Sequence, residues 1–187
     1  MKNIHIILIV SFFLLVLGFI FLQKEKFPIA TNSAVGTSEK LATAEEIPMT
    51  YSNPRQYFSF QYPNEYKVNE MIDRDSKGLV QGEIVLVQAK SGDRERGLQI
   101  TILPFDETDT TLTKERIQKD IPDMQINDAQ TIVLGGVDAL SFSSNNSDFG
   151  GASKEVWLVH NNFLFQISTH ASNTALVNNI LSTWQFQ

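Results

Sequence analysis

The pattern of hydrophobic and polar positions divides this chain into three parts. An apolar run from Ile4 to Leu22 contains no charged residue. A helix rises about 1.5 Å per residue, so this run would cover about 28 Å, close to the hydrocarbon thickness of a bilayer. Residues 24–50 lack a periodic apolar face, which is typical of a flexible tether. Residues 51–187 return to short apolar stretches and are long enough to form one domain with its own core.

The apolar run predicts an N-terminal membrane anchor covering residues 1–23. A cleaved signal peptide has a shorter apolar region followed closely by small residues, whereas this run ends in Phe21-Leu22-Gln23-Lys24. We therefore favour a permanent anchor and keep a cleaved, secreted form as the alternative. Lys24 and Lys26 after the run favour a cytoplasmic domain, but a short basic N-terminus at Lys2 favours the opposite orientation. We expect an extracytoplasmic domain on a single-pass anchor, with a bacterial cell membrane favoured.

Period-two alternation and turn residues predict about six to eight strands in the domain. The candidate strands are residues 57–62, 66–72, 83–89, 98–105, 130–134, 137–143, 155–160 and 163–170. Gly135-Gly136 and Asn161-Asn162 each predict a two-residue hairpin turn, and the charged stretch Ser91–Gly97 predicts a longer one. Pro63-Asn64 predicts a turn that makes residues 66–72 the partner of residues 57–62. Hairpin connections of this kind indicate an antiparallel sheet.

Two segments have a helical rather than a strand pattern. Thr111–Ile121 follows an acidic cluster and ends before Pro122, as expected of an amphipathic helix. After Ser172, a predicted N-cap, apolar residues fall at helical spacing up to Trp184. The predicted fold class is α+β: an antiparallel β-sheet covered by helices.

Composition excludes several kinds of function. The domain carries 11 Lys and Arg against 17 Asp and Glu, a net charge of −6, which argues against nucleic-acid binding. The chain has no cysteine, so disulfides, thiolate metal sites and cysteine nucleophiles are excluded. We therefore expect no nucleic acid among its partners, and the sequence suggests no cofactor.

Candidate metal ligands lack a recognisable arrangement. Asp73–Gly78 resembles the start of a calcium loop, but Lys77 and Ile84 occupy the fifth and twelfth positions, where ligands belong. His5 lies in the apolar run, and a hairpin at Asn161-Asn162 would place His160 and His170 far apart. We expect no metal site.

Catalytic motifs are also missing, and we expect no catalytic residue. No nucleophile elbow is present among the serines. The alternative is a hydrolase or metal-dependent enzyme with a site spread over loops, for which Asp106, Glu107, Asp109 and His170 are the best candidates. A loop rich in Ser, Asn and Gly carries Asp148 and Phe149, which we single out as a possible contact site for a partner.

The domain resembles PsbP/Mog1-like domains. The resemblance rests on the strand Phe58-x-Phe60-x-Tyr62-Pro63, the charged hairpin, the first helix, the Gly-Gly-linked strands and the Trp184-x-Phe186 end. It implies an antiparallel sheet between helical layers and non-enzymatic work assisting larger assemblies. Tyr66 stands where such domains often have a Trp. The function expected is a non-catalytic binding or assembly domain with an unknown, membrane-associated protein partner.

Overall fold

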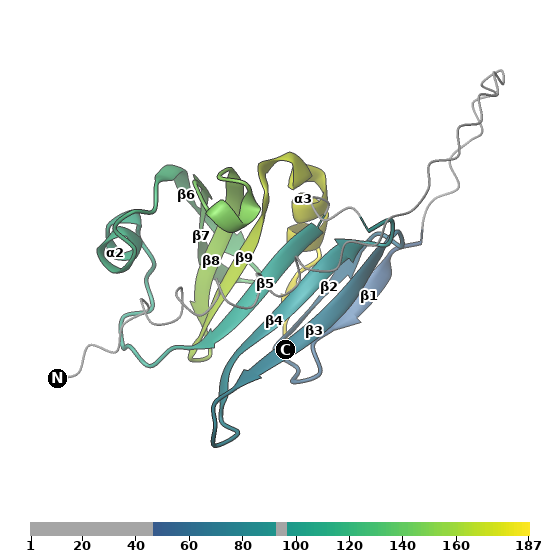
Figure 1. Ribbon diagram of the computed structural model, residues 1–187, viewed down its shortest axis with the longest axis horizontal. Helices are drawn as coiled ribbons and strands as arrows, with labels where there is room; N and C mark the ends of the chain where they lie inside the picture. Colours follow the sequence, from purple (N-terminus) through teal and green to yellow (C-terminus); the bar gives the residue numbers. More distant parts are fainter. Residues whose placement is uncertain (1–46, 93–96) are drawn as a thin grey trace. The chain divides into compact units, whose positions relative to one another are not determined.

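The computed structural model describes residues 47–92 and 97–187 (Figure 1). The predicted membrane span from Ile4 to Leu22 and nearly all of the predicted tether lie outside the described residues. Within those ranges, no helix is long and apolar enough to cross a bilayer. The first strand already begins at Met49, shortly before the predicted start of the domain.

Ten strands form two antiparallel sheets in the described part of the chain. The small sheet has the order β1-β2-β10, and the large sheet has the order β3-β4-β5-β9-β8-β7-β6. The strands are β1 Met49–Ser52, β2 Phe58–Tyr62, β3 Tyr66–Arg74, β4 Val80–Ala89, β5 Gly97–Pro104, β6 Ile126–Leu134, β7 Val137–Ser144, β8 Ser153–His160, β9 Phe163–His170 and β10 Gln185–Phe186. The antiparallel α+β class is confirmed, and the seven strands of the large sheet fall within the predicted number. The separate small sheet was not predicted.

Three predicted hairpins are confirmed: β4 with β5, β6 with β7 and β8 with β9. Asn161 and Asn162 both have positive φ, as a tight turn between strands requires. Gly135 also has positive φ, and a side chain on it would collide with the ring of Phe186. The turn after β6 therefore needs glycine both for its backbone and for its contact with the C-terminal segment.

The predicted pairing of the first two strands is wrong. β2 pairs with β1 on one side and with β10 on the other, whereas β3 pairs with β4. The chain leaves one sheet and enters the other at the turn after Pro63. The reason lies in the aromatic face of β2, because the ring of Phe58 stacks on Trp184 with centroids 4.3 Å apart. The end of the chain therefore follows β2 and supplies β10.

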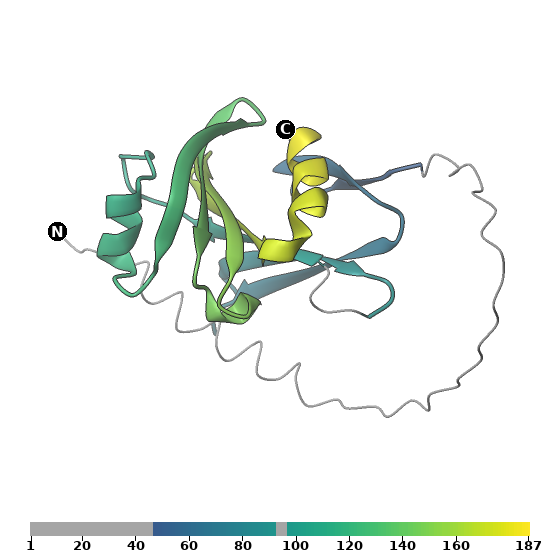
Figure 2. The same cartoon turned by 90° about the horizontal axis from the view of Figure 1, so that it is seen from above.

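The large sheet is covered on both faces, and neighbouring residues of β8 point into different cores. Val156 packs in a core shared with the small sheet and the C-terminal helix, whereas Trp157 packs in a smaller core with Ile117 of the first helix. Figure 2 shows helices α2 and α3 on opposite sides of strands β6 to β9. The predicted helical layers are thus present, but one of them also contains a second sheet.

Both predicted helices exist, with different ends. Helix α2 is Lys114–Asp120, and the Thr113 side chain caps it by accepting from the Arg116 amide. A 3₁₀ turn, Ala171–Asn173, precedes helix α3, which is Thr174–Ser182. The predicted cap at Ser172 is therefore wrong, because the chain first makes this tighter turn.

Candidate functional site

A buried carboxylate lies at the centre of the β7–β8–β9 region. Glu155 of β8 has none of its surface exposed. Its two carboxylate oxygens accept hydrogen bonds from three strands and one loop. The donors are the hydroxyls of Ser153 (2.6 Å), Ser144 (3.3 Å) and Ser168, the Trp157 indole (3.1 Å) and the Asn146 amide (3.4 Å). Burial raises the pKa of Glu155, and the hydrogen bonds act in the opposite direction.

This cluster holds strands together rather than meeting a substrate. Ser144, Glu155 and Ser168 lie on one face of three adjacent strands, because Phe142 is opposite Glu155 on β7 and Ser168 is opposite it on β9. A side chain without exposed surface cannot touch a ligand in this conformation. The geometry therefore assigns Glu155 a structural role, with its carboxylate shared by three strands.

The predicted contact loop adjoins this cluster, because Asn146 at its start donates to Glu155. Its 3₁₀ turn is Ser147–Phe149, and the amide of Asp148 donates to the Asn146 side chain. Phe149 folds back so that its ring meets the His170 ring edge-on, with centroids 5.4 Å apart. Asp148 is exposed and Phe149 is half-buried. A contact role for these two residues stays a prediction.

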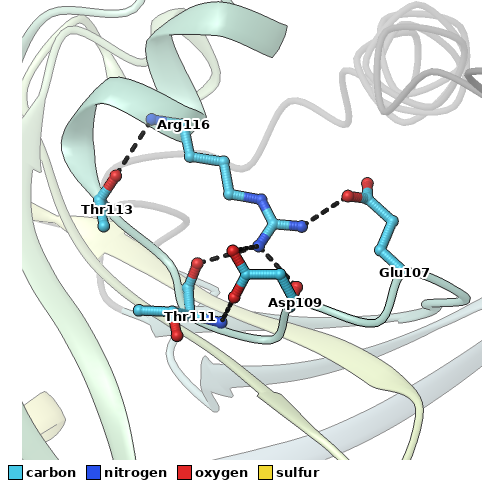
Figure 3. Close-up of polar contacts among 5 residues, drawn as sticks. All are labelled: Glu107, Asp109, Thr111, Thr113 and Arg116. Carbon is cyan, nitrogen blue, oxygen red and sulfur yellow. Dashed lines mark hydrogen bonds and ion pairs between the residues drawn. The ribbon is translucent and has the colours of Figure 1, made fainter.

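The acidic group after β5 is occupied by an arginine of helix α2 (Figure 3). Arg116 forms an ion pair with Glu107 at 2.7 Å and donates to the backbone oxygens of Asp109 and Thr111. Its guanidinium also lies 5.3 Å from the centre of the Phe105 ring. The Thr111 amide, more than Arg116, lowers the pKa of Asp109.

The alternative hydrolase site is not assembled. Pro104 lies opposite Phe163 at the start of β9, and His170 lies at its end. Seven residues of extended chain at about 3.3 Å each separate the two ends of β9 by about 23 Å, so His170 lies at the far end of β9 from the acidic group. Among the described residues, no group of three or more His, Asp or Glu could hold a metal ion. Asp73 lies in β3, and the rest of the calcium-loop-like segment leads into the turn before β4, where Asp75 accepts from the backbone amides of Lys77 and Leu79.

A second polar cluster joins the two sheets. The Tyr51 hydroxyl of β1 donates to Glu70 of β3 at 2.8 Å. The Asn53 amide donates to buried Glu83 of β4 at 2.5 Å, and Arg55 lies 3.4 Å from the other oxygen of Glu83. Burial, and secondly Glu70, raises the pKa of Tyr51. These bonds fix β1 alongside β3.

Beside these bonds lies an exposed surface that the sequence did not predict. β1 ends the small sheet and β3 ends the large one, so two open strand edges lie on the same side (Figure 1). We call β1, with the preceding Ile47, and β3 the double edge. Five large apolar side chains are exposed in the described ranges, and four belong to this edge or to the turn after it. They are Ile47 (81% exposed), Met49 (48%), Ile72 (45%) and Leu79 (61%).

This concentration marks the double edge as the candidate interaction surface. Single exposed apolar residues are common, but apolar residues gathered on one side are characteristic of a surface that binds a partner. The only sequence signal was the alternation in β3, where Val68, Glu70 and Ile72 share a face. The sequence could not place them at an open edge without knowing the strand order.

Comparisons with known proteins found a similarity in structure but none in sequence. No family model matches the chain, and no curated protein matches it. The solution structure of cyanobacterial PsbP (CyanoP) from Synechocystis sp. PCC 6803 is similar, with a TM-score of 0.48 and 14% sequence identity. The match covers 82% of this chain and 99% of that one. The chain thus resembles a PsbP protein in structure, as it resembles that family in sequence pattern. A similarity of this degree says nothing about what the chain binds.

Proposed function

We propose that this chain is a non-catalytic binding or assembly domain whose partner is a protein, held outside the cytoplasm by a membrane anchor. The observation that carries the proposal is the double edge, where Ile47, Met49 and Ile72 expose apolar surface beside open backbone edges. Binding by strand addition uses such edges, since main-chain hydrogen bonds supply affinity and exposed side chains supply specificity.

The polar groups of the domain support the same proposal. Both carboxylate oxygens of Glu155 accept hydrogen bonds within the domain. Glu107 forms an ion pair with Arg116, and Glu83 forms one with Arg55. Each of these carboxylates therefore makes contacts that stabilise the domain. The anchor is proposed from the apolar run between Ile4 and Leu22, whose length suits a bilayer.

Site-specific photocrosslinking tests the proposal in the cells that make the protein. A photoreactive amino acid replaces Ile72 or Met49 in the full chain, and mass spectrometry identifies what is attached. The matched control is Glu115, which is exposed on helix α2 away from the double edge. We expect reproducible protein adducts at the double edge and none at Glu115. Equal labelling at all three positions, or none at the edge, would refute it.

A further inference from the structure

We propose that the double edge binds a second copy of this chain, and that the two β3 strands pair antiparallel with Glu70 opposite Glu70. This deepens the proposed function by naming the partner of the same surface. The proposal commits to a second copy because backbone geometry and side-chain charges select the same register.

The backbone of β3 limits which registers are possible. The Lys90 amide donates to the Glu65 oxygen, so the backbone groups of Glu65 point toward β4. In an antiparallel pair this direction alternates, and the backbone groups of Val68, Glu70 and Ile72 therefore point away from β4. Among the described residues, none donates to or accepts from these three backbones on the open side. Two copies can pair regularly only where outward-pointing residues lie opposite one another.

Charge then selects among the allowed registers. With Glu70 opposite itself, Lys67 lies opposite Asp73 of the second copy, and the two-fold axis repeats this pair. Val68 then lies opposite Ile72, which also occurs twice and covers exposed apolar surface. Opposite charges and apolar pairs facing each other across strands are both stabilising. The paired stretch, residues 67–73, ends where β3 loses its regular pairing with β4.

The neighbouring allowed registers are worse. A shift of two residues in one direction places Glu65 opposite Asp73, a like-charged pair. The same shift in the other direction places Lys67 opposite Asp75, which lies beyond the irregularity after Asp73. The chosen register has one unfavourable contact, between the two Glu70 side chains. Each of these carboxylates is exposed and accepts a hydrogen bond from the Tyr51 hydroxyl.

Cysteine crosslinking tests the register in the full chain, because the natural sequence has no cysteine. In a hydrogen-bonded antiparallel pair the facing Cα atoms lie about 5.5 Å apart, within disulfide range. Glu70→Cys should therefore give a disulfide-linked dimer when membranes are oxidised. Lys67→Cys alone should not, because its two copies would lie about 20 Å apart along the strand. Gln130→Cys, on the open edge strand β6 at the other end of the sheet, controls for random collision.

Charge exchange then tests the facing pair. In the Glu70→Cys background, Lys67→Asp or Asp73→Lys alone places like charges opposite each other twice. Either change should weaken self-association about tenfold and reduce the linked fraction accordingly. The double exchange restores two opposite-charge pairs and should restore linkage. Recovery in the double variant excludes misfolding as the cause of the losses.

The outcomes separate this inference from the proposed function. Linkage at Glu70 that follows the charge exchange supports the paired strands. No linkage at Glu70, equal linkage at Gln130, or linkage insensitive to charge overturns the second copy as partner. If photocrosslinking at Ile72 then captures a different protein, the double edge remains a binding surface and only the identity of its partner changes.

Discussion

Removing one hydroxyl from the buried Glu155 cluster should destabilise the domain measurably. Oε2 of Glu155 accepts from two groups, Ser168 and Trp157. Ser168→Ala leaves this buried oxygen with the indole alone. A hydrogen bond to a charged group contributes about 1.5–3 kcal/mol, so we expect a loss of about 2 kcal/mol in the free energy of unfolding at pH 7. For a domain of this size, that corresponds to a fall in Tm of roughly 6 °C.

The loss should depend on pH in a defined direction. Burial raises the pKa of Glu155 in the folded state, so the folded state holds its proton more tightly than the unfolded chain. The contribution of this group to stability is fully present below the unfolded pKa and is lost as pH rises through the folded pKa. Ser168→Ala removes a donor to the carboxylate and raises the folded pKa further. Its destabilising effect should therefore grow as pH rises through the folded pKa.

Urea unfolding of residues 47–187, followed by tryptophan fluorescence at several pH values, measures both effects. Ser141→Ala is the matched control, because Ser141 is also buried but lies opposite Val156 on the other face of the sheet. The reasoning is refuted if Ser168→Ala costs no more than Ser141→Ala at pH 7. It is also refuted if the difference between the two variants does not change with pH.

Three further outcomes are expected. Trp184→Ala removes the ring stacked on Phe58 and should lower the free energy of unfolding by about 3–5 kcal/mol, seen as a lower urea midpoint with an unchanged slope. Arg116→Ala releases Glu107 and the Asp109 backbone, so it should cost about 1 kcal/mol or less in urea unfolding and speed proteolysis within residues 106–113. Unchanged proteolysis would contradict the role of Arg116 in holding this segment. Micromolar calcium or zinc should leave Tm unchanged. A rise of several degrees would support the alternative that the chain is a metal-dependent enzyme.

Local features of the fold were predictable from the sequence because the signals are local. Gly135-Gly136 and Asn161-Asn162 adopt the positive φ that tight turns need, and the strands on either side pair as expected. Helix α2 likewise follows from its apolar spacing, the acidic residues before it and Pro122 after it, whereas its cap at Thr113 was not predicted. These elements depend on residues within one turn or one hairpin.

Features that depend on distant pairing were not predictable. β2 takes its partners from β1 and from a two-residue strand at the chain end, and no local pattern indicates either. Glu155 looks like one polar residue in an apolar strand, and the donors Ser144 and Ser168 come from neighbouring strands whose register had to be known. The double edge was not predicted for the same reason, because only the order of the strands shows which of them lie at an edge.

Amide hydrogen exchange on the full chain tests most directly whether the double edge pairs with a second copy. In an isolated domain, the outward-pointing amides of Val68, Glu70 and Ile72 have no partner among the described residues and should exchange fast, while those of Asn69 and Met71 are paired with β4 and exchange slowly. If the double edge pairs with a second copy, all five amides exchange slowly, and Lys67→Asp speeds exchange at the three outward positions alone. Fast exchange at Val68, Glu70 and Ile72 in the unmodified chain would contradict the account.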